Sequence, residues 1–165
     1  MAAGFVCGIC GKQHDHEPMA IAYRRPASFF TIPKEERDRR VQCNDDLCAI
    51  DGRQFFIRGV LELPIRGTDT SFDWGVWARV DQRDFQRYLD AWRADTEDDV
   101  PPFSGWLSGG PASYPDSDGL EVSVRLRSGG LRPDFTVRSA SHPLGVDQRQ
   151  GISLEKAHQF WPGPA

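Results

Sequence analysis

Residues 72–80 read FDWGVWARV and residues 82–94 read QRDFQRYLDAWRA. This stretch predicts the fold of the chain most directly. In the first half, apolar side chains recur at every second position and share one face, as in a half-buried strand. These are Phe72, Trp74, Val76, Ala78 and Val80. In the second half, apolar residues follow the spacing i, i+3, i+4, i+7 of a helical stripe. These are Phe85, Tyr88, Leu89 and Trp92.

The second half predicts a helix over 81–94, with Asp81 as its N-cap. We interpret its apolar stripe as a core-packing face and prefer this to a face for a cofactor or partner. Consecutive elements usually pack against each other. Trp74 and Val76 are therefore expected to share a core with Phe85, Leu89 and Trp92.

Outward from this stretch, the patterns predict short strands joined by local hairpins. Strands are expected at 54–63, 120–127 and 135–138, with turns at Asp51-Gly52 and Ser128-Gly129-Gly130. Short helices are expected at 33–40 and 153–160. Since no strand–helix–strand rhythm recurs, the predicted fold class is α+β, a mostly antiparallel sheet covered by one helix, with an N-terminal zinc-knuckle-like segment.

The chain of 165 residues is predicted to form a single domain, 1–165. Residues 95–119, rich in Asp, Pro, Gly and Ser, are predicted to be a long loop anchored by its aromatics. Such loops are often functional. We expect this loop to border the main cleft, with Trp106 or Tyr114 facing it. The neighbouring arginines would give the cleft a cationic wall for an anionic group. They are Arg125, Arg127, Arg132 and Arg138.

Charge and hydropathy exclude several classes of protein. With 24 acidic and 20 basic residues, the net charge of −4 makes nucleic acid an unfavourable partner. No stretch reaches the roughly 20 apolar residues of a membrane helix, and residues 1–10 do not resemble a signal peptide. A cytoplasmic location is expected, without membrane contact. There the four cysteines are expected to be thiols or metal ligands rather than disulfides.

Residues 5–18 form a Cys/His-rich segment with the pattern C-x2-C-G-x2-H, from Cys7 through Cys10 to His14. Two thiolates at this spacing can bind one tetrahedral zinc, and His14 can supply a third ligand. Cys48, Cys43 and His142 are the candidates for a fourth. Alternatively, the cysteines are small buried residues or a redox pair, and the histidines are solvated.

A second possible site surrounds His142, which Asp147, Gln148 and Arg149 follow closely. A histidine beside an acid could act as a general acid or base, although no nucleophile stands in a recognisable context. This pattern supports the alternative function, a small hydrolase-like enzyme that uses the metal or His142.

Short motifs follow one another along nearly the whole chain. They are the Cys7–His14 pattern, DLCAIDG at 46–52, FFIRGVL at 55–61, WGVW at 74–77, PFSGWLS at 102–108, GLRP at 130–133, and HPL at 142–144 through Ile152. With these motifs the chain resembles a bacterial family of uncharacterised proteins, the domain of unknown function 2199. This resemblance covers nearly the whole chain in order. It implies no activity, but it places Cys48 in the family pattern more firmly than Cys43. The implied zinc ligands are therefore Cys7, Cys10, Cys48 and His14, with His14 ahead of His142.

Together these observations predict a zinc-stabilised binding or interaction module rather than an enzyme, with a structural zinc as its cofactor. Its partner is expected to be an unidentified protein or a small anionic ligand. A nucleic-acid binder would be supported only by the likeness of the Cys segment to zinc knuckles. The net charge of −4 opposes it.

Overall fold

The structure is a computed structural model that describes residues 5–6, 13–14 and 19–160. Its strands are β1 (Phe5–Val6), β2 (Gln13–His14), β3 (Ala20–Ala22), β4 (Val41–Cys43), β5 (Leu47–Ile50), β6 (Gln54–Pro64), β7 (Ser71–Val80), β8 (Phe103–Leu107), β9 (Glu121–Arg125) and β10 (Asp134–Val137). Its helices are the 3-10 turns η1 (Ala27–Thr31), η2 (Lys34–Glu36) and η3 (Glu97–Asp99), and the α-helices α1 (Arg37–Arg40), α2 (Gln82–Ala94), α3 (Pro143–Gln150) and α4 (Leu154–Gln159).

Five of these strands close into a barrel in the order β6, β7, β8, β9, β10 and back to β6. All neighbours in the ring are antiparallel except β10 and β6, which run parallel where Asp134 faces Val60. The expected mostly antiparallel α+β sheet is therefore present, but it closes on itself. The prediction of a sheet covered by one helix is corrected to a closed barrel with several short helices around it.

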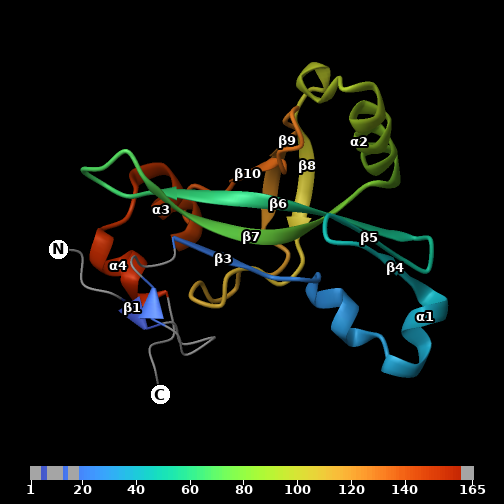
Figure 1. Cartoon of the computed structure of the whole chain (residues 1–165), viewed down its shortest axis with the longest axis horizontal. Helices are drawn as coiled ribbons and strands as arrows, with labels where there is room; N and C mark the ends of the chain where they lie inside the picture. Colours follow the sequence, from blue (N-terminus) through green and yellow to red (C-terminus); the bar gives the residue numbers. More distant parts are fainter. Residues whose placement is uncertain (1–4, 7–12, 15–18, 161–165) are drawn as a thin grey trace.

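The hairpin of β6 and β7 is the longest pairing and lies across the whole molecule (Figure 1). It runs from the Phe55–Val80 pair to the Pro64–Ser71 pair. All five residues of the predicted apolar face of β7 are buried in the main core, which confirms the period-2 prediction. The opposite face is covered too, since Trp77 packs with Ile32, Ile50 and Phe56 in a second cluster. Both faces are apolar because the strand lies between two cores.

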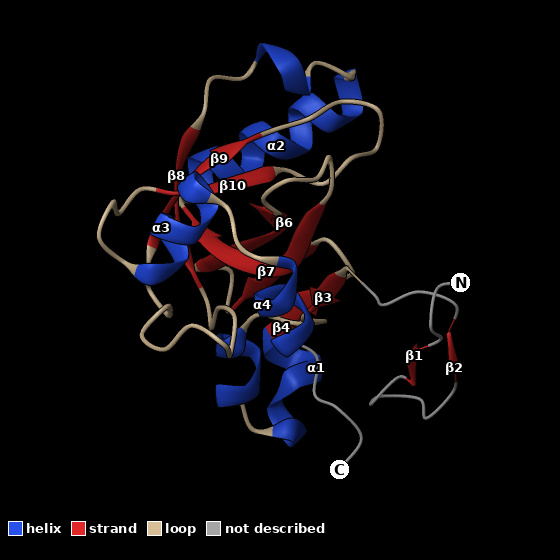
Figure 2. Cartoon of the chain, turned by 90° about the vertical axis from the view of Figure 1, so that its left-hand side faces the viewer, coloured by secondary structure: helices blue, strands red, loops and turns tan. Residues whose placement is uncertain are grey.

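Segments outside the ring extend the two long strands. β3 runs parallel to the first half of β7, and β5 with β4 continues the sheet from the other edge of β6. In both views, α2 lies at the top of the molecule and α1 at the bottom (Figures 1 and 2). None of the helices in the described part of the chain has the length and apolar character needed to cross a membrane.

Helix α2 confirms the predicted helix, but its packing departs from the prediction at two residues, Leu89 and Trp92. Leu89 is only partly buried and does not pack against the main core. Phe85 and Tyr88 pack against the main core and Ala91 is buried, but Trp92 is 58% exposed. The prediction that Trp92 belongs to the core is wrong. At its C-terminus, Asp95 adopts a left-handed conformation (φ 55°), and its N–H bonds to the carbonyls of Ala91 and Trp92. Such a cap changes the direction of the chain, and η3 begins at Glu97, two residues after it.

The segment 95–119 is less irregular than predicted, since it contains η3 and the barrel strand β8. Phe103, Gly105 and Leu107 alternate as buried residues along β8, a short period-2 pattern between prolines and glycines. Tyr114 is buried, and its hydroxyl donates to Asp147 Oδ2 at 2.6 Å. Lys156 Nζ donates to the same oxygen at 2.5 Å. Tyr114 therefore ties this segment to α3 and α4.

Candidate functional site

The structure describes two of the four predicted zinc ligands, His14 and Cys48. Cys7 and Cys10 lie outside the described residues, and His14 belongs to β2, which pairs with β1 through Phe5. Cys48 is fully buried and forms a disulfide with Cys43, its cross-strand neighbour. For these two cysteines the disulfide corrects the expectation of thiols or metal ligands. A thiolate ligates zinc and a disulfide sulfur does not, so Cys48 is available to a metal only after reduction. Among the residues that the structure describes, no group of three or more His, Cys, Asp or Glu side chains is arranged to hold a metal.

The residues around His142 have mainly structural contacts. His142 caps α3, because its Nδ1 accepts a hydrogen bond from the N–H of Leu144 at 3.1 Å. Asp147 is occupied by Tyr114 and Lys156. Gln148 bridges the carbonyl of Phe135 and the N–H of Val137, each at 2.8 Å. The predicted acid/base group is therefore dispersed among anchors of α3.

Each arginine of the predicted cationic wall lies beside an acid. Arg125 and Arg127 both reach Asp134, at 3.2 and 3.6 Å. Arg138 lies 3.8 Å from Glu121 Oε1. Exposed pairs of this kind contribute little to stability, yet they neutralise the wall. An anion at this surface would have to compete with these carboxylates.

A small cavity of about 80 Å³ lies between α2 and two turns from other parts of the chain. We call it the Trp92 pocket. Its walls come from residues 44–47 between β4 and β5, from α2 with η3, and from residues 127–132 between β9 and β10. Trp92 and Leu131, 58% and 55% exposed, are two of the four large apolar side chains exposed on the described surface. Both line this pocket.

Glu97 is the buried acid of the Trp92 pocket. Its side chain lines the cavity and is 1% exposed. Its Oε2 has no hydrogen-bond partner within the described residues, and no ion pair there includes it. A buried carboxylate without a donor is costly, so this position is the polar feature of the pocket that the fold leaves unmatched.

Tyr88 places a phenol in the same wall. Burial raises its pKa to about 12, and the negative charges of Asp46 and Glu97 add to this effect, while Arg132 opposes it. The hydroxyl is therefore a neutral hydrogen-bond donor at physiological pH. The charges of Asp46, Glu97 and Arg132 therefore all influence the Tyr88 hydroxyl.

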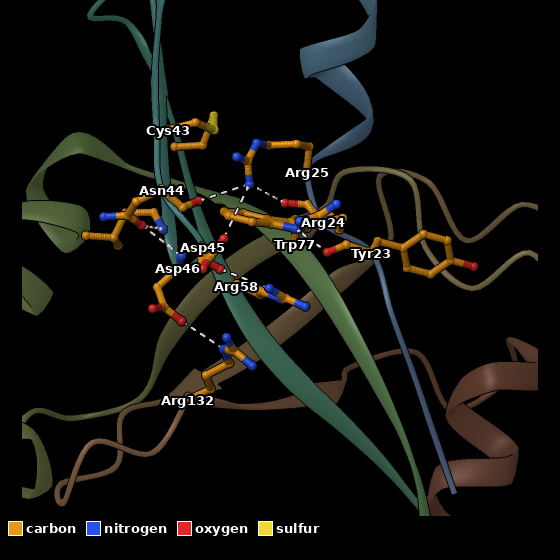
Figure 3. Close-up of polar contacts among 12 residues, drawn as sticks. Tyr23, Arg24, Arg25, Cys43, Asn44, Asp45, Asp46, Arg58, Trp77 and Arg132 are labelled. Atoms are coloured by element: carbon orange, nitrogen blue, oxygen red, sulfur yellow. Dashed lines mark hydrogen bonds and ion pairs between the residues drawn. A yellow bond between two sulfur atoms is a disulfide. The ribbon is translucent and has the colours of Figure 1, made fainter. Parts of the chain in front are cut away.

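The turn 44–47 forms a well-determined wall (Figure 3). Asn44 Oδ1 accepts hydrogen bonds from the N–H groups of Asp46 and Leu47, at 2.8 and 2.7 Å. The Cys43–Cys48 disulfide closes the ring around this turn. Such side-chain bonds and the covalent bridge both restrict the backbone, so this wall is shaped before any ligand arrives.

Arginines fix this turn to the rest of the barrel. Arg132 Nε donates to Asp46 Oδ1 at 2.8 Å, linking the two turns on either side of the pocket (Figure 3). Arg58, in β6, donates to the carbonyl of Asp45 at 3.1 Å. Burial lowers the pKa of Arg58, and the nearby charge of Arg132 lowers it further. The guanidinium keeps its charge in the working range because its ordinary pKa is so high.

Sequence reasoning missed the two central residues of this pocket. Trp92 was assigned to the core by its place in the apolar stripe, and Glu97 was part of an acidic run that reads as exposed. The predicted border between the 95–119 segment and a cleft exists, but through residues 97–102. Trp106 is half-buried in β8 and Tyr114 is buried, so neither lines the Trp92 pocket.

Comparison with known proteins identifies a family but no activity. The family model described as "Uncharacterized protein conserved in bacteria (DUF2199)" matches residues 6–152. The chain therefore belongs to this family, as the resemblance implied. Neither a curated protein nor a solved structure matches it.

Proposed function

We propose that this member of an uncharacterised bacterial family is a binding module, and that its ligand occupies the Trp92 pocket. The observation that carries the proposal is the cavity itself, which pairs exposed apolar side chains with a buried carboxylate and a partly buried phenol. Ligand sites combine an apolar lining with a few placed polar groups. Here Trp92 and Leu131 supply the first, and Glu97 and Tyr88 the second.

The walls of this pocket are held before binding, which favours recognition. The Asn44 bonds, the disulfide and the Asp46–Arg132 ion pair fix the two turns. A preformed site binds with less loss of conformational entropy than one that must be ordered. Among its lining residues there is no Ser, Thr, Cys or His, so the described pocket supplies no aliphatic hydroxyl or thiol nucleophile and no imidazole base. We therefore favour binding over catalysis.

The proposal is tested by screening fragments of varied charge against the full chain by two-dimensional NMR. We expect hits whose chemical shifts cluster on residues 88–97 and 127–132. Trp92→Ala should abolish them while leaving the fold intact, because Trp92 is exposed. Phe30→Ala is the matched control, since it removes an exposed aromatic that does not line the pocket. Hits that survive Trp92→Ala, or an absence of hits, would overturn the proposal.

A further inference from the structure

We infer that the group bound in the Trp92 pocket is a primary ammonium or a guanidinium, with Glu97 as its counter-ion. This inference rests on the proposed function, since it names the chemistry of the ligand at the same site. It adds a binding residue, Glu97, and a ligand class opposite to the anionic one that the sequence suggested.

The burial of Glu97 favours a cationic ligand. Glu97 is only 1% exposed, and its Oε2 has no donor among the described residues. A carboxylate in this setting gains most from a charged donor, because charge-assisted hydrogen bonds are the strong ones. An ammonium or guanidinium inside the cavity would provide both the charge and the N–H groups.

The charge balance of the pocket walls also favours a cationic ligand. The cationic side chains that line the pocket, Arg127 and Arg132, each have carboxylate neighbours already. Arg132 pairs with Asp46 at 2.8 Å and Arg127 lies 3.6 Å from Asp134. Arg127 Nε also donates to the carbonyl of Arg132 at 2.7 Å. Glu97 is therefore the lining charge without a protein counter-ion in the described structure.

The aromatic lining of the pocket favours organic cations as well. Trp92 and Tyr88 both border the cavity. The faces of aromatic rings attract organic cations, with Trp the most effective, and guanidinium groups stack on them. An anion would gain nothing from these rings and would be repelled by Glu97. The lining therefore discriminates by charge as well as by shape.

The volume of the cavity limits the size of the bound group. A cavity of about 80 Å³ holds a head group of a few heavy atoms rather than a whole metabolite. The exposed rings and methyls of Trp92 and Leu131 then offer apolar surface to a methylene chain leading to that head group. This geometry suits a free alkylamine and equally a lysine or arginine side chain of a peptide.

The experiment titrates the full chain with four probes of matched chain length by NMR: butylammonium, butylguanidinium, butanol and butyrate. The two cations are expected to bind at residues 88–97, and butanol and butyrate at least roughly tenfold more weakly, as loss of a charged hydrogen bond implies. Nα-acetyl-lysine methylamide distinguishes the sources. Tighter binding than butylammonium would indicate a peptide side chain, and weaker binding a free amine.

Two variants isolate Glu97. Glu97→Gln keeps the shape and should weaken butylammonium roughly tenfold or more. Asp99→Asn makes the same charge change at an exposed residue of the same 3-10 helix and should leave the affinity within about twofold, since screened exposed charges interact weakly. Melting temperatures of both variants verify that the fold persists. Glu97→Gln should not lower its melting temperature, because it removes an uncompensated buried charge.

The failure of this inference is distinguishable from the failure of the proposed function. If butanol or butyrate binds as tightly as the amines, or if Glu97→Gln changes nothing, the cation assignment is overturned. The pocket then remains a ligand site provided that binding still depends on Trp92. If no cation binds and the cavity holds only water, the cation assignment is likewise overturned, and a fragment screen without Trp92-dependent hits refutes both proposals.

Discussion

At the scale of single residues, the four cysteines carry the most chemistry in this chain, and they divide into two pairs. Cys43 and Cys48 form a disulfide. Cys7 and Cys10 lie outside the described residues and keep the spacing of a zinc half-site. Because one sulfur cannot be both in a disulfide and a thiolate ligand, the redox state of Cys48 decides whether it can join them.

We therefore predict that protein purified with reductant and without chelators carries about one zinc per chain, as a four-ligand structural site requires. Elemental analysis of Cys7→Ser should show its loss, with a lower melting temperature because metal binding stabilises the folded state. If Cys48 is the fourth ligand, Cys48→Ala should also lose zinc, whereas Cys43→Ala should retain it. Wild-type protein without metal would contradict the zinc proposal.

At the scale of elements, the β4–β5 hairpin contributes both to the stability of the fold and to the wall of the candidate site. Its disulfide closes a ring of a few residues, and the turn inside that ring lines the Trp92 pocket. A covalent ring of this size restricts the unfolded chain only modestly, because the entropic gain rises with the length of the closed loop.

Reduction of this disulfide is predicted to lower the free energy of unfolding by about 2 kcal/mol, the value for a very short loop. Urea melts with and without dithiothreitol measure the difference. The Cys43→Ala/Cys48→Ala double variant is the control and should respond to urea identically in both conditions. A stability unchanged by reduction in the wild type would argue against the bridge.

At the scale of the whole molecule, closure of the barrel depends on a close approach between β10 and β6. Gly59 lies in β6, and a Cβ atom there would overlap the ring of Phe135 in β10. Phe135 is itself buried in the main core. The missing side chain of Gly59 therefore makes room for an aromatic ring that fills the barrel.

Gly59→Ala is predicted to destabilise the fold by about 1–3 kcal/mol, the usual cost of overpacking a core. Chemical denaturation measures this loss. Phe135→Leu in the same chain should recover part of it, because the smaller side chain vacates the overlapping space, and a double-mutant cycle gives the coupling. Additive effects of the two substitutions would show that the residues do not meet.

The elements with strong apolar periodicity, and the family, can be predicted from the amino-acid sequence alone. The strand at 72–80 and the helix at 81–94 recur as β7 and α2 within a residue or two. The strand at 54–63 and the return strand at 135–138 recur as β6 and β10. These succeed because apolar period 2 or 3.6 is a local property that burial on one face imposes.

Closure of the sheet, the position of β8 and the candidate site depend on long-range packing and could not be predicted from local sequence patterns. The alternation of Phe103, Gly105 and Leu107 is too short to stand out between prolines and glycines. The burial of Glu97 and the exposure of Trp92 depend on turns between 30 and 53 positions away in the chain, at 127–132 and 44–47. A side chain's local pattern states which face it shares, whereas the segments packed opposite determine whether that face meets a core, solvent or a cavity.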